Sequence, residues 1–337
     1  ETGQHREALR CYEEALRLAT EGRWRAQEAI CRINVGLTHV SLDEPAKARD
    51  FLVTGREMAR DLGNPRLEAT AMGNLAFVYA RSGELEEALE LERETLARVT
   101  RLALPGMQAS CWWRTSHVLF QLRRYQDAAD AARQGVDLLP RIVGSLDDES
   151  GASAMERWTG LVENGVLAGV RLDDPATVFR FLESGRSGVL LDSLGNRKRL
   201  GEIAIPAEMR ELEAKHRDRE RAALQRYRRA LDQGEDVEDL WKEVEVARDG
   251  ITEVVHRIRR DARLQADLVH PEVATLAAIR STLNQGDALV LYALGDHHSF
   301  FALVIEPDSA RIVELEDGKS ILEIAASLAD AACQPLD

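Results

Sequence analysis

Two glycine-containing patterns have residue types that could serve phosphate or acyl-transfer chemistry. Gly318-Lys319-Ser320 has the end of a phosphate-binding loop, but that motif needs a glycine five residues earlier, where the chain has Val313. Gly185-Arg186-Ser187-Gly188 is one residue short of a nucleophile elbow and lies in a helical pattern rather than after a strand. Neither pattern is therefore expected to be a nucleotide site or a catalytic site.

The cysteines and histidines also lack the spacing of a metal site. His297 and His298 are adjacent, so on an extended segment they would point to opposite faces and could not ligate one metal. The four cysteines lie far apart and form no C-x-x-C pair: Cys11, Cys31, Cys111 and Cys333. We therefore predict no metal, no cofactor and no disulfide framework.

Cys333 differs from the other cysteines in lying within a possible catalytic motif. Ala332-Cys333-Gln334 superficially resembles the Q-A-C motif around the caspase nucleophile, which lies at the end of a buried strand. The apolar residues before it have helical spacing, from Ile321 to Ala332, so Cys333 is predicted to end a helix. We predict that the chain contains no catalytic residue.

The composition excludes several protein classes. The chain has 337 residues, a formal charge of -14, 45% hydrophobic residues and 5% aromatic residues. An acidic balance argues against a dedicated nucleic-acid binder, because such proteins collect basic charge. No stretch reaches the roughly 18 consecutive apolar residues of a membrane span. We expect a cytoplasmic globular protein with two or three domains.

The elements that would position any site follow from a 40-residue period in the first half of the chain. Small residues recur at this interval, and helices approach closely only where side chains are small. The positions that show the period are Ala8, Ala48, Ala88 and Ala128; Gly36, Ala76 and Ser116; and Ala15, Gly55, Thr95 and Gly135. Each repeat is predicted to be a helical hairpin, with helices over about 66–81 and 84–100 in the best-defined one.

These repeats resemble the tetratricopeptide signature in pieces. Trp112, the pair Leu75-Ala76, Tyr79 and the spacing from Ala8 to Tyr12 match its characteristic positions. HEAT-like or armadillo-like repeats stay possible from the length of the period alone. We predict tetratricopeptide-like repeats over residues 1–195, with a longer loop at 144–153 and a last hairpin at 155–195.

Such a stack forms a superhelix whose inner groove can hold an extended peptide. Asn34, Asn74 and Arg114 occupy one repeat position, where peptide-binding tetratricopeptide proteins use asparagine for the ligand backbone and arginine for a carboxylate. The lysines of a carboxylate clamp are missing, so a C-terminal carboxylate ligand is not expected. The predicted groove residues are Asn34, Asn74, Phe77, Trp113, Arg114 and His117. An alternative is that the asparagines only bond between neighbouring helices.

Residues 196–265 are predicted to form a charged helical hairpin that is broken near Gln233. Its first helix is locally basic, but acidic residues are interleaved, which favours a solvated helix over a nucleic-acid patch. Residues 266–337 change to strand patterns at 288–294, 299–305 and 310–315, followed by a helix at about 320–332. The strands are apolar on both faces, as in a sheet covered by helices on each side. Only one following helix is available, so the predicted sheet is unfinished.

The order of these segments is similar to that of the CHAT family, caspase-like peptidase domains associated with tetratricopeptide repeats. The resemblance rests on Phe181 to Leu194, on Ala274 to Leu283 and on Asp287 to Tyr292, with Gly188 and Leu291 as departures from the family pattern. It implies a fold that is mainly α, with a repeat superhelix, a helical hairpin and the opening meander of an incomplete α/β caspase-like domain.

The resemblance also implies that the catalytic His and Cys follow later strands, beyond Asp337, so residues 1–337 by themselves are expected to be inactive. Their expected role is the sensing and scaffolding portion of a CHAT cysteine peptidase, with a protein or peptide in the groove and the rest of the CHAT domain as partners. The alternative is a non-catalytic tetratricopeptide scaffold of a signalling or regulatory protein.

Overall fold

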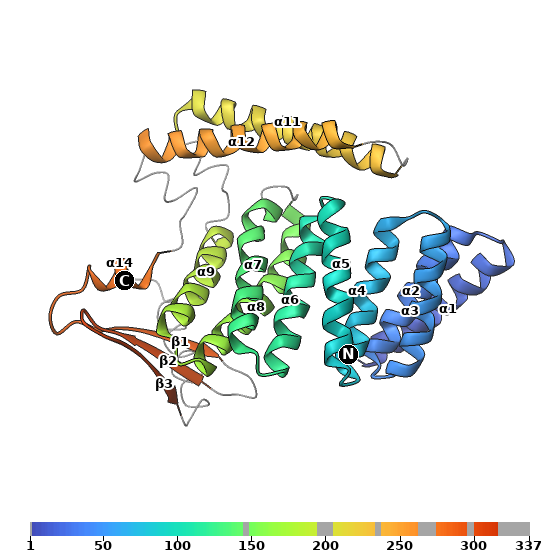
Figure 1. The fold of residues 1–337 in the computed structure, drawn as a ribbon, viewed down its shortest axis with the longest axis horizontal. Helices are drawn as coiled ribbons and strands as arrows, with labels where there is room; N and C mark the ends of the chain where they lie inside the picture. The colour runs from blue at the N-terminus through green and yellow to red at the C-terminus, as the bar shows by residue number, and fades with distance from the viewer. Residues whose placement is uncertain are drawn as a thin grey trace, which may run out of the picture.

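The computed structural model describes residues 2–143, 148–193, 205–232, 237–261, 274–294 and 300–315. Its helices stack side by side, a long helical hairpin lies along one side of the stack, and a small sheet closes one end (Figure 1). The stack consists of α1 (Thr2–Glu21), α2 (Arg25–Ser41), α3 (Pro45–Asp61), α4 (Pro65–Arg81), α5 (Leu85–Arg101), α6 (Pro105–Gln121), α7 (Tyr125–Val143), α8 (Asp148–Arg171) and α9 (Pro175–Ser193).

The 40-residue period arises from two identical helix-plus-turn units. Each helix from α2 to α6 has 17 residues, and three residues separate it from the next. The central turn residue has a left-handed backbone in every case: Arg23, Asp43, Gly63, Gly83, Ala103 and Arg123, with φ between 49° and 81°. In the turn after α2, Glu44 N donates to His39 O (2.9 Å) and Asp43 N to Val40 O (3.1 Å), which terminates the helix. The predicted hairpins are confirmed.

Small residues at the repeat positions allow neighbouring helices to pack closely. Ala48, Ala88 and Ala128 are fully buried. At Gly36 an added Cβ would lie 2.7 Å from Leu52 Cγ, so this position has no room for a larger residue. Core formation therefore explains the periodic residues that carry no chemistry.

The predicted loop at 144–153 is wrong in its second half, because α8 already begins at Asp148. The period slips because α7 has 19 residues and α8 has 24. The last hairpin is thus longer than its predecessors rather than preceded by a long loop.

The helical hairpin consists of α11 (Ala207–Asp232) and α12 (Glu238–Asp261), as predicted. It contacts the repeats at the turn between α5 and α6. Ala103 packs in a cluster with Ala223, Tyr227 and Val244. The Tyr227 hydroxyl donates to Arg101 O, which anchors the hairpin across 126 residues of sequence.

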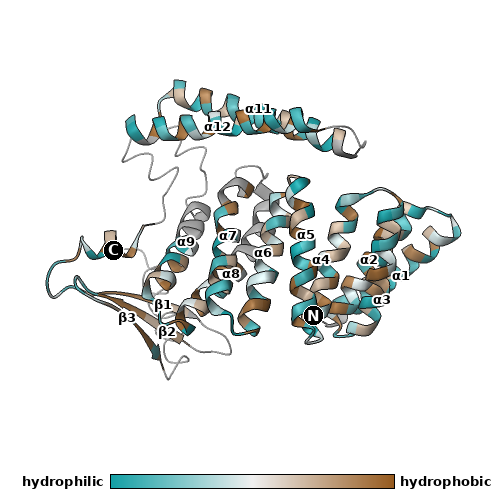
Figure 2. Ribbon diagram, viewed as in Figure 1, coloured by the Kyte–Doolittle hydropathy of each residue, from teal (hydrophilic) through white to brown (hydrophobic). Residues whose placement is uncertain are grey.

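The sheet is an antiparallel meander of β1 (Leu289–Leu294), β2 (Phe300–Ile305) and β3 (Ala310–Leu315), preceded by the short helix α14 (Leu276–Arg280). Leu291 pairs with Leu303, and Leu303 with Ile312. Leu303 and Ile305 are buried in the same core as the last repeats, and α9 packs on β2 and β3. Apolar residues accordingly dominate the strands, whereas the hairpin is largely hydrophilic (Figure 2).

Several predictions lie outside the described residues: the helix at 320–332, Cys333, Gly318 to Ser320, and the His297-His298 pair. The division at 195 and 265 likewise remains a prediction. None of the helices that the structure describes is long and apolar enough to span a membrane.

Candidate functional site

The candidate site is the face of α4 and α6 where four of the six predicted groove residues meet. A small hollow there is lined by Ala76, Phe77 and Ala80 from α4, Glu92 from α5, and Trp113, Arg114, His117 and Val118 from α6. Its volume of about 10 Å³ has room for one water at most. Ligand pockets are larger by more than tenfold, so this surface suits a docking segment rather than an enclosed small molecule.

Phe77 and Trp113 form an aromatic platform across α4 and α6. Their ring centroids are 6.3 Å apart and their planes differ by 28°. Both side chains are half-buried, which leaves part of each ring in contact with solvent. The indole lies against α8, because an added Cβ on Gly160 would be 2.4 Å from Trp113 Nε1. The platform is therefore held in place from three helices.

Asn164 of α8 fixes the platform through hydrogen bonds to α6. Its side-chain amide donates to Ser116 Oγ (2.8 Å) and to the Trp113 carbonyl (3.3 Å), and Asn164 is 7% exposed. Ser116 Oγ donates in turn to the Trp113 carbonyl (2.8 Å). These bonds satisfy buried polar groups and fix the approach of α6 to α8.

His117 lies one turn after Trp113 and has an exposed edge. Its Nε2 is 3.0 Å from Gln121 Nε2. Desolvation of the inner part of the ring lowers the pKa of His117, and a hydrogen bond with Asn164 only partly opposes this effect. His117 is therefore a neutral polar group at the groove near pH 7.

Arg114 makes a buried ion pair with Glu92 of α5. The guanidinium contacts both carboxylate oxygens through Nε and Nη2, with Nη2 3.2 Å from Oε2, and Nη2 lies 3.5 Å from Cys111 Sγ. The Glu92 side chain is 1% exposed and that of Arg114 15%. Gly73 makes the space, because a Cβ there would be 2.6 Å from Arg114 Nη2. The charge of Arg114 is thus neutralised within the chain.

The pair changes the chemistry of its neighbours. Burial raises the pKa of Glu92, and the positive charge of Arg114, which lowers it, offsets this effect only in part. Burial together with the charge of Glu92 raises the pKa of Cys111 to about 12. A thiol with such a pKa is protonated at neutral pH and is a poor nucleophile. Cys111, 1% exposed, is therefore a residue of the core and not a nucleophile.

Asn34 on α2 and Asn74 on α4 are half-buried and occupy equivalent positions of neighbouring repeats. The Asn34 carbonyl accepts a bond from Thr38 Oγ1 (2.8 Å), within its own helix. In the part of the chain that the structure describes, neither asparagine uses its side-chain amide in a hydrogen bond. The bridging role between helices, the alternative considered from the sequence, is therefore not seen for these two side chains.

Glu92 and Asn164 were not predicted from the sequence. A signal for Glu92 was present, because residues 40 before and after it are Leu52 and Ala132, both 0% exposed. A charge at a core position of a repeat implies a buried partner. Asn164 lies after the period slips, so no repeat position identified it. Within the described residues, no group of His, Cys, Asp or Glu could hold a metal ion.

Comparisons with known proteins add a family match over part of the chain. The crystal structure of BtubC (BKLC) from P. vanneervenii is similar at a TM-score of 0.43 and 16% identity, covering 76% of this chain and 91% of that one. None of the curated proteins matches the sequence. Residues 69–103, which hold most of α4 and all of α5, match the tetratricopeptide-repeat family. The chain is therefore a tetratricopeptide-repeat-containing protein, and such repeats generally mediate protein–protein interaction and scaffolding.

Proposed function

We propose that the groove face of α2, α4 and α6 binds an extended segment of a protein partner. The observation that carries the proposal is the pair of half-buried asparagines, Asn34 and Asn74, whose amides are not bonded to any described residue. An amide has a donor and an acceptor, which match one peptide unit of an extended chain. Two of them, one repeat apart, can hold successive parts of one ligand backbone.

The platform of Phe77 and Trp113 gives the groove its side-chain preference. An apolar or aromatic ligand side chain would bury area against the two rings. Arg114 is already neutralised by Glu92, and His117 is neutral, so neither of these two residues offers a free cation to a ligand. The ligand is therefore an internal segment with an apolar residue, rather than a chain end held by its carboxylate.

Selection of linear peptides from a random display library on the purified chain, followed by calorimetry on the enriched peptides, tests this proposal. Asn74→Ala should weaken binding about fivefold, since one hydrogen bond contributes about 1 kcal/mol. Arg93→Ala is the matched control, because Arg93 lies on α5 with its side chain 73% exposed. Failure to enrich any peptide, or equal affinity of Asn74→Ala and the control, would contradict the proposal.

A finer hypothesis is that the chain is the sensing and scaffolding portion of a CHAT cysteine peptidase. Its support is the sequence resemblance from Phe181 to Leu194 and from Ala274 to Tyr292. Partner binding in the groove would then be relayed through the hairpin to the catalytic remainder of the CHAT domain. The chain itself should have no peptidase activity, and activity that Cys333→Ala abolishes would contradict this.

The sequence of the source gene after the codon for Asp337 provides the second test of the CHAT hypothesis. An apolar strand ending in His and a later one ending in Cys are expected there. A downstream sequence without them would remove the peptidase hypothesis but would leave peptide binding in the groove unaffected.

A further inference from the structure

A second surface lies where the hairpin meets the repeats, and it is rich in arginine. Arg228 of α11 donates through Nη2 to Ala103 O (3.2 Å), at the end of α5. Arg66 lies at the start of α4, beside the end of α5, because Ala69 and Val99 share one buried cluster. Arg248 lies on α12 and bonds Glu220 of α11, the helix that carries Arg228. Burial, together with the charges of Arg66 and Arg248, lowers the pKa of Arg228. We call Arg66, Arg228 and Arg248 the arginine cluster. It joins three elements from distant parts of the sequence.

Among the residues that the structure describes, one carboxylate pairs with this cluster. Arg248 pairs with Glu220 (2.7 Å) and lies over the Trp241 ring (5.3 Å). Within the described ranges, neither Arg66 nor Arg228 forms an ion pair, and both side chains reach solvent. Three arginines beside one carboxylate leave a net positive charge, which a further anion would stabilise.

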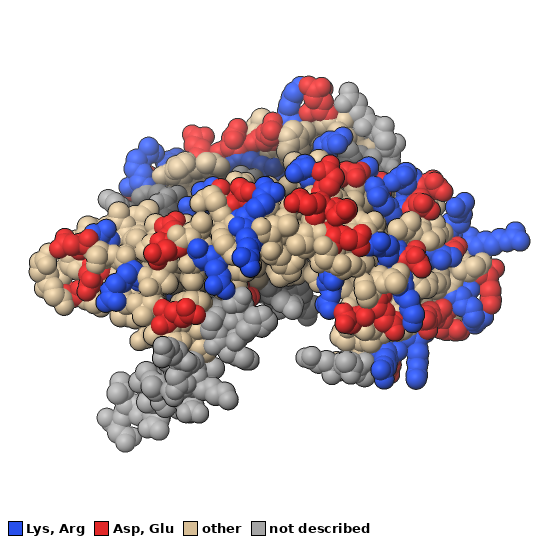
Figure 3. All heavy atoms as spheres, turned by 60° about the horizontal axis from the view of Figure 1, so that its bottom comes forward, with Lys and Arg blue, Asp and Glu red and all other residues tan. Residues whose placement is uncertain are grey.

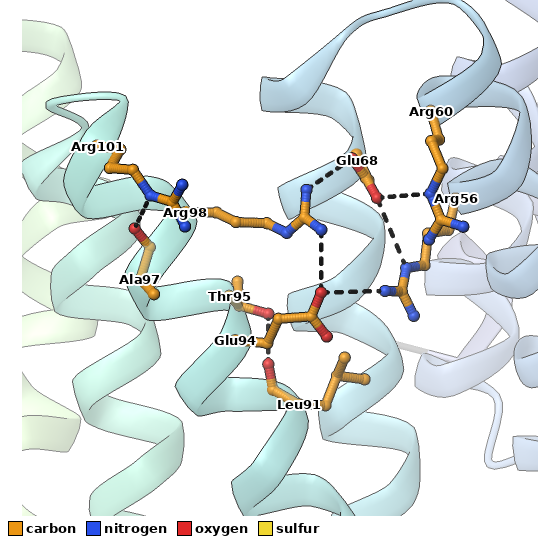
Figure 4. A network of polar contacts seen from close by, with 9 residues as sticks. All are labelled: Arg56, Arg60, Glu68, Leu91, Glu94, Thr95, Ala97, Arg98 and Arg101. Atoms are coloured by element: carbon orange, nitrogen blue, oxygen red, sulfur yellow. Dashed lines mark hydrogen bonds and ion pairs between the residues drawn. The ribbon is translucent and has the colours of Figure 1, made fainter.

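The neighbouring charge network cannot supply that anion. Arg56, Arg60 and Arg98 share two carboxylates, those of Glu68 and Glu94 (Figure 4). Glu68 bonds Arg60 Nε at 3.1 Å and Arg98 Nη1 at 3.0 Å, so both of its oxygens are used. This network joins α3, α4 and α5 and carries an excess of positive charge itself.

The arginine cluster has the opposite charge to the molecule as a whole. The formal charge is -14, and on the face in Figure 3 basic and acidic side chains are interleaved over most of the surface. We propose that the arginine cluster binds an acidic segment of a protein partner, whose carboxylates pair with Arg66 and Arg228. Guanidinium groups bind carboxylates through paired charge-assisted hydrogen bonds, which gives the site its chemistry.

A peptide fits this surface better than a nucleic acid does. A polyanion longer than the cluster would meet the negative remainder of the molecule, whereas a short acidic segment can contact the cluster alone. The two aromatic side chains described there also leave little surface for base stacking, because Arg248 lies over the Trp241 ring and Tyr227 is 5% exposed. The cluster lies at the helix ends that meet the hairpin, whereas the asparagines of the groove lie in the middle of α2 and α4. One partner could therefore engage both surfaces, or two partners one each.

Fluorescence anisotropy with a labelled oligoglutamate peptide tests the proposal on the full chain. Arg66→Gln and Arg228→Gln should each weaken binding about tenfold, the loss of a charge-assisted bond, and binding should weaken between about 50 and about 200 mM NaCl. Arg228→Lys, which keeps the charge, should lose less than Arg228→Gln. Arg93→Gln removes an exposed arginine that pairs with Glu90 and should change the affinity less than about twofold.

Three outcomes would overturn the proposal. The first is no binding at the lower salt concentration, and the second is equal binding by Arg66→Gln, Arg228→Gln and the control. The third is tighter binding of a single-stranded oligonucleotide of the same charge, which would assign the cluster to nucleic acid. Arg66→Gln is the decisive variant, because the Arg66 side chain has no bond to a described residue and its loss leaves the hairpin contact intact.

Discussion

Replacing Arg114 with methionine should destabilise the chain strongly. Methionine keeps much of the volume but leaves the Glu92 carboxylate, 1% exposed, without its cation. Removing one partner of a buried ion pair costs about 3–5 kcal/mol. Urea denaturation followed by far-ultraviolet circular dichroism should therefore show a large decrease in midpoint with little change in slope.

The pH dependence of the stability of Arg114→Met shows whether the unpaired Glu92 carboxylate causes the destabilisation. Without the guanidinium, burial holds the pKa of Glu92 further above its unfolded value of about 4.3. A carboxyl that binds its proton more tightly when folded stabilises the protein at low pH and loses this effect as pH rises through the folded pKa. The free energy of unfolding of Arg114→Met should thus fall as the pH rises above the unfolded pKa of about 4.3, by at most about 1.4 kcal/mol per pH unit.

The double variant Glu92→Leu, Arg114→Met is the control. It places at position 92 the residue type that the chain has at Leu52, one repeat earlier. A buried pair replaced by apolar residues is often as stable as the original, so most of the lost stability should return and the added pH dependence should vanish. A cost below about 1 kcal/mol for Arg114→Met, or a double variant no more stable than the single one, would refute the role of the pair.

Three further predictions concern other contacts. Because the pKa of His117 is lowered in the folded state, stability should fall as pH decreases from about 7.5 to about 5.5, and denaturation of His117→Gln should show a smaller decrease. Gly135→Ala should cost about 1–3 kcal/mol, since its Cβ would lie 2.5 Å from a leucine of α8, whereas Gly106→Ala, with nothing within 4 Å, should be neutral or stabilising in the same assay. Tyr227→Phe removes the hydrogen bond to the Arg101 carbonyl and should lower the free energy of unfolding by about 1 kcal/mol, seen as a lower urea midpoint. An unchanged midpoint would show that this hydrogen bond is dispensable.

The repeat architecture was predictable because small residues recur in the sequence at a fixed interval of 40 residues. Small residues at fixed intervals, such as Ala48 and Ala88, are required wherever helices approach closely, so their spacing fixes the hairpins. The three strands were predictable for a similar reason, since their apolar runs are bounded by turn residues. The start of α8 was missed because polar residues at a helix start resemble those of a loop.

The details of the site depend on contacts between helices, which one sequence does not specify. Arg114 occupies the repeat position of Asn34 and Asn74, so it was assigned to the ligand, but Glu92 on the preceding helix pairs with it. The docking of Tyr227 on Arg101 joins residues 126 apart and has no periodic signal. The ion pair of Arg114 with Glu92 could have been predicted from one feature, which is a charged residue at a core position of the repeat.

The affinity of a double variant, Asn34→Ala with Asn74→Ala, for a library-selected peptide is the decisive test of peptide binding in the groove. The two amides are in separate repeats and would hold separate peptide units, so their effects should add. We expect about a 25-fold loss of affinity, the product of two fivefold losses, with an unchanged far-ultraviolet spectrum. A double variant that binds the same peptide within about twofold of the original chain would contradict peptide binding in the groove.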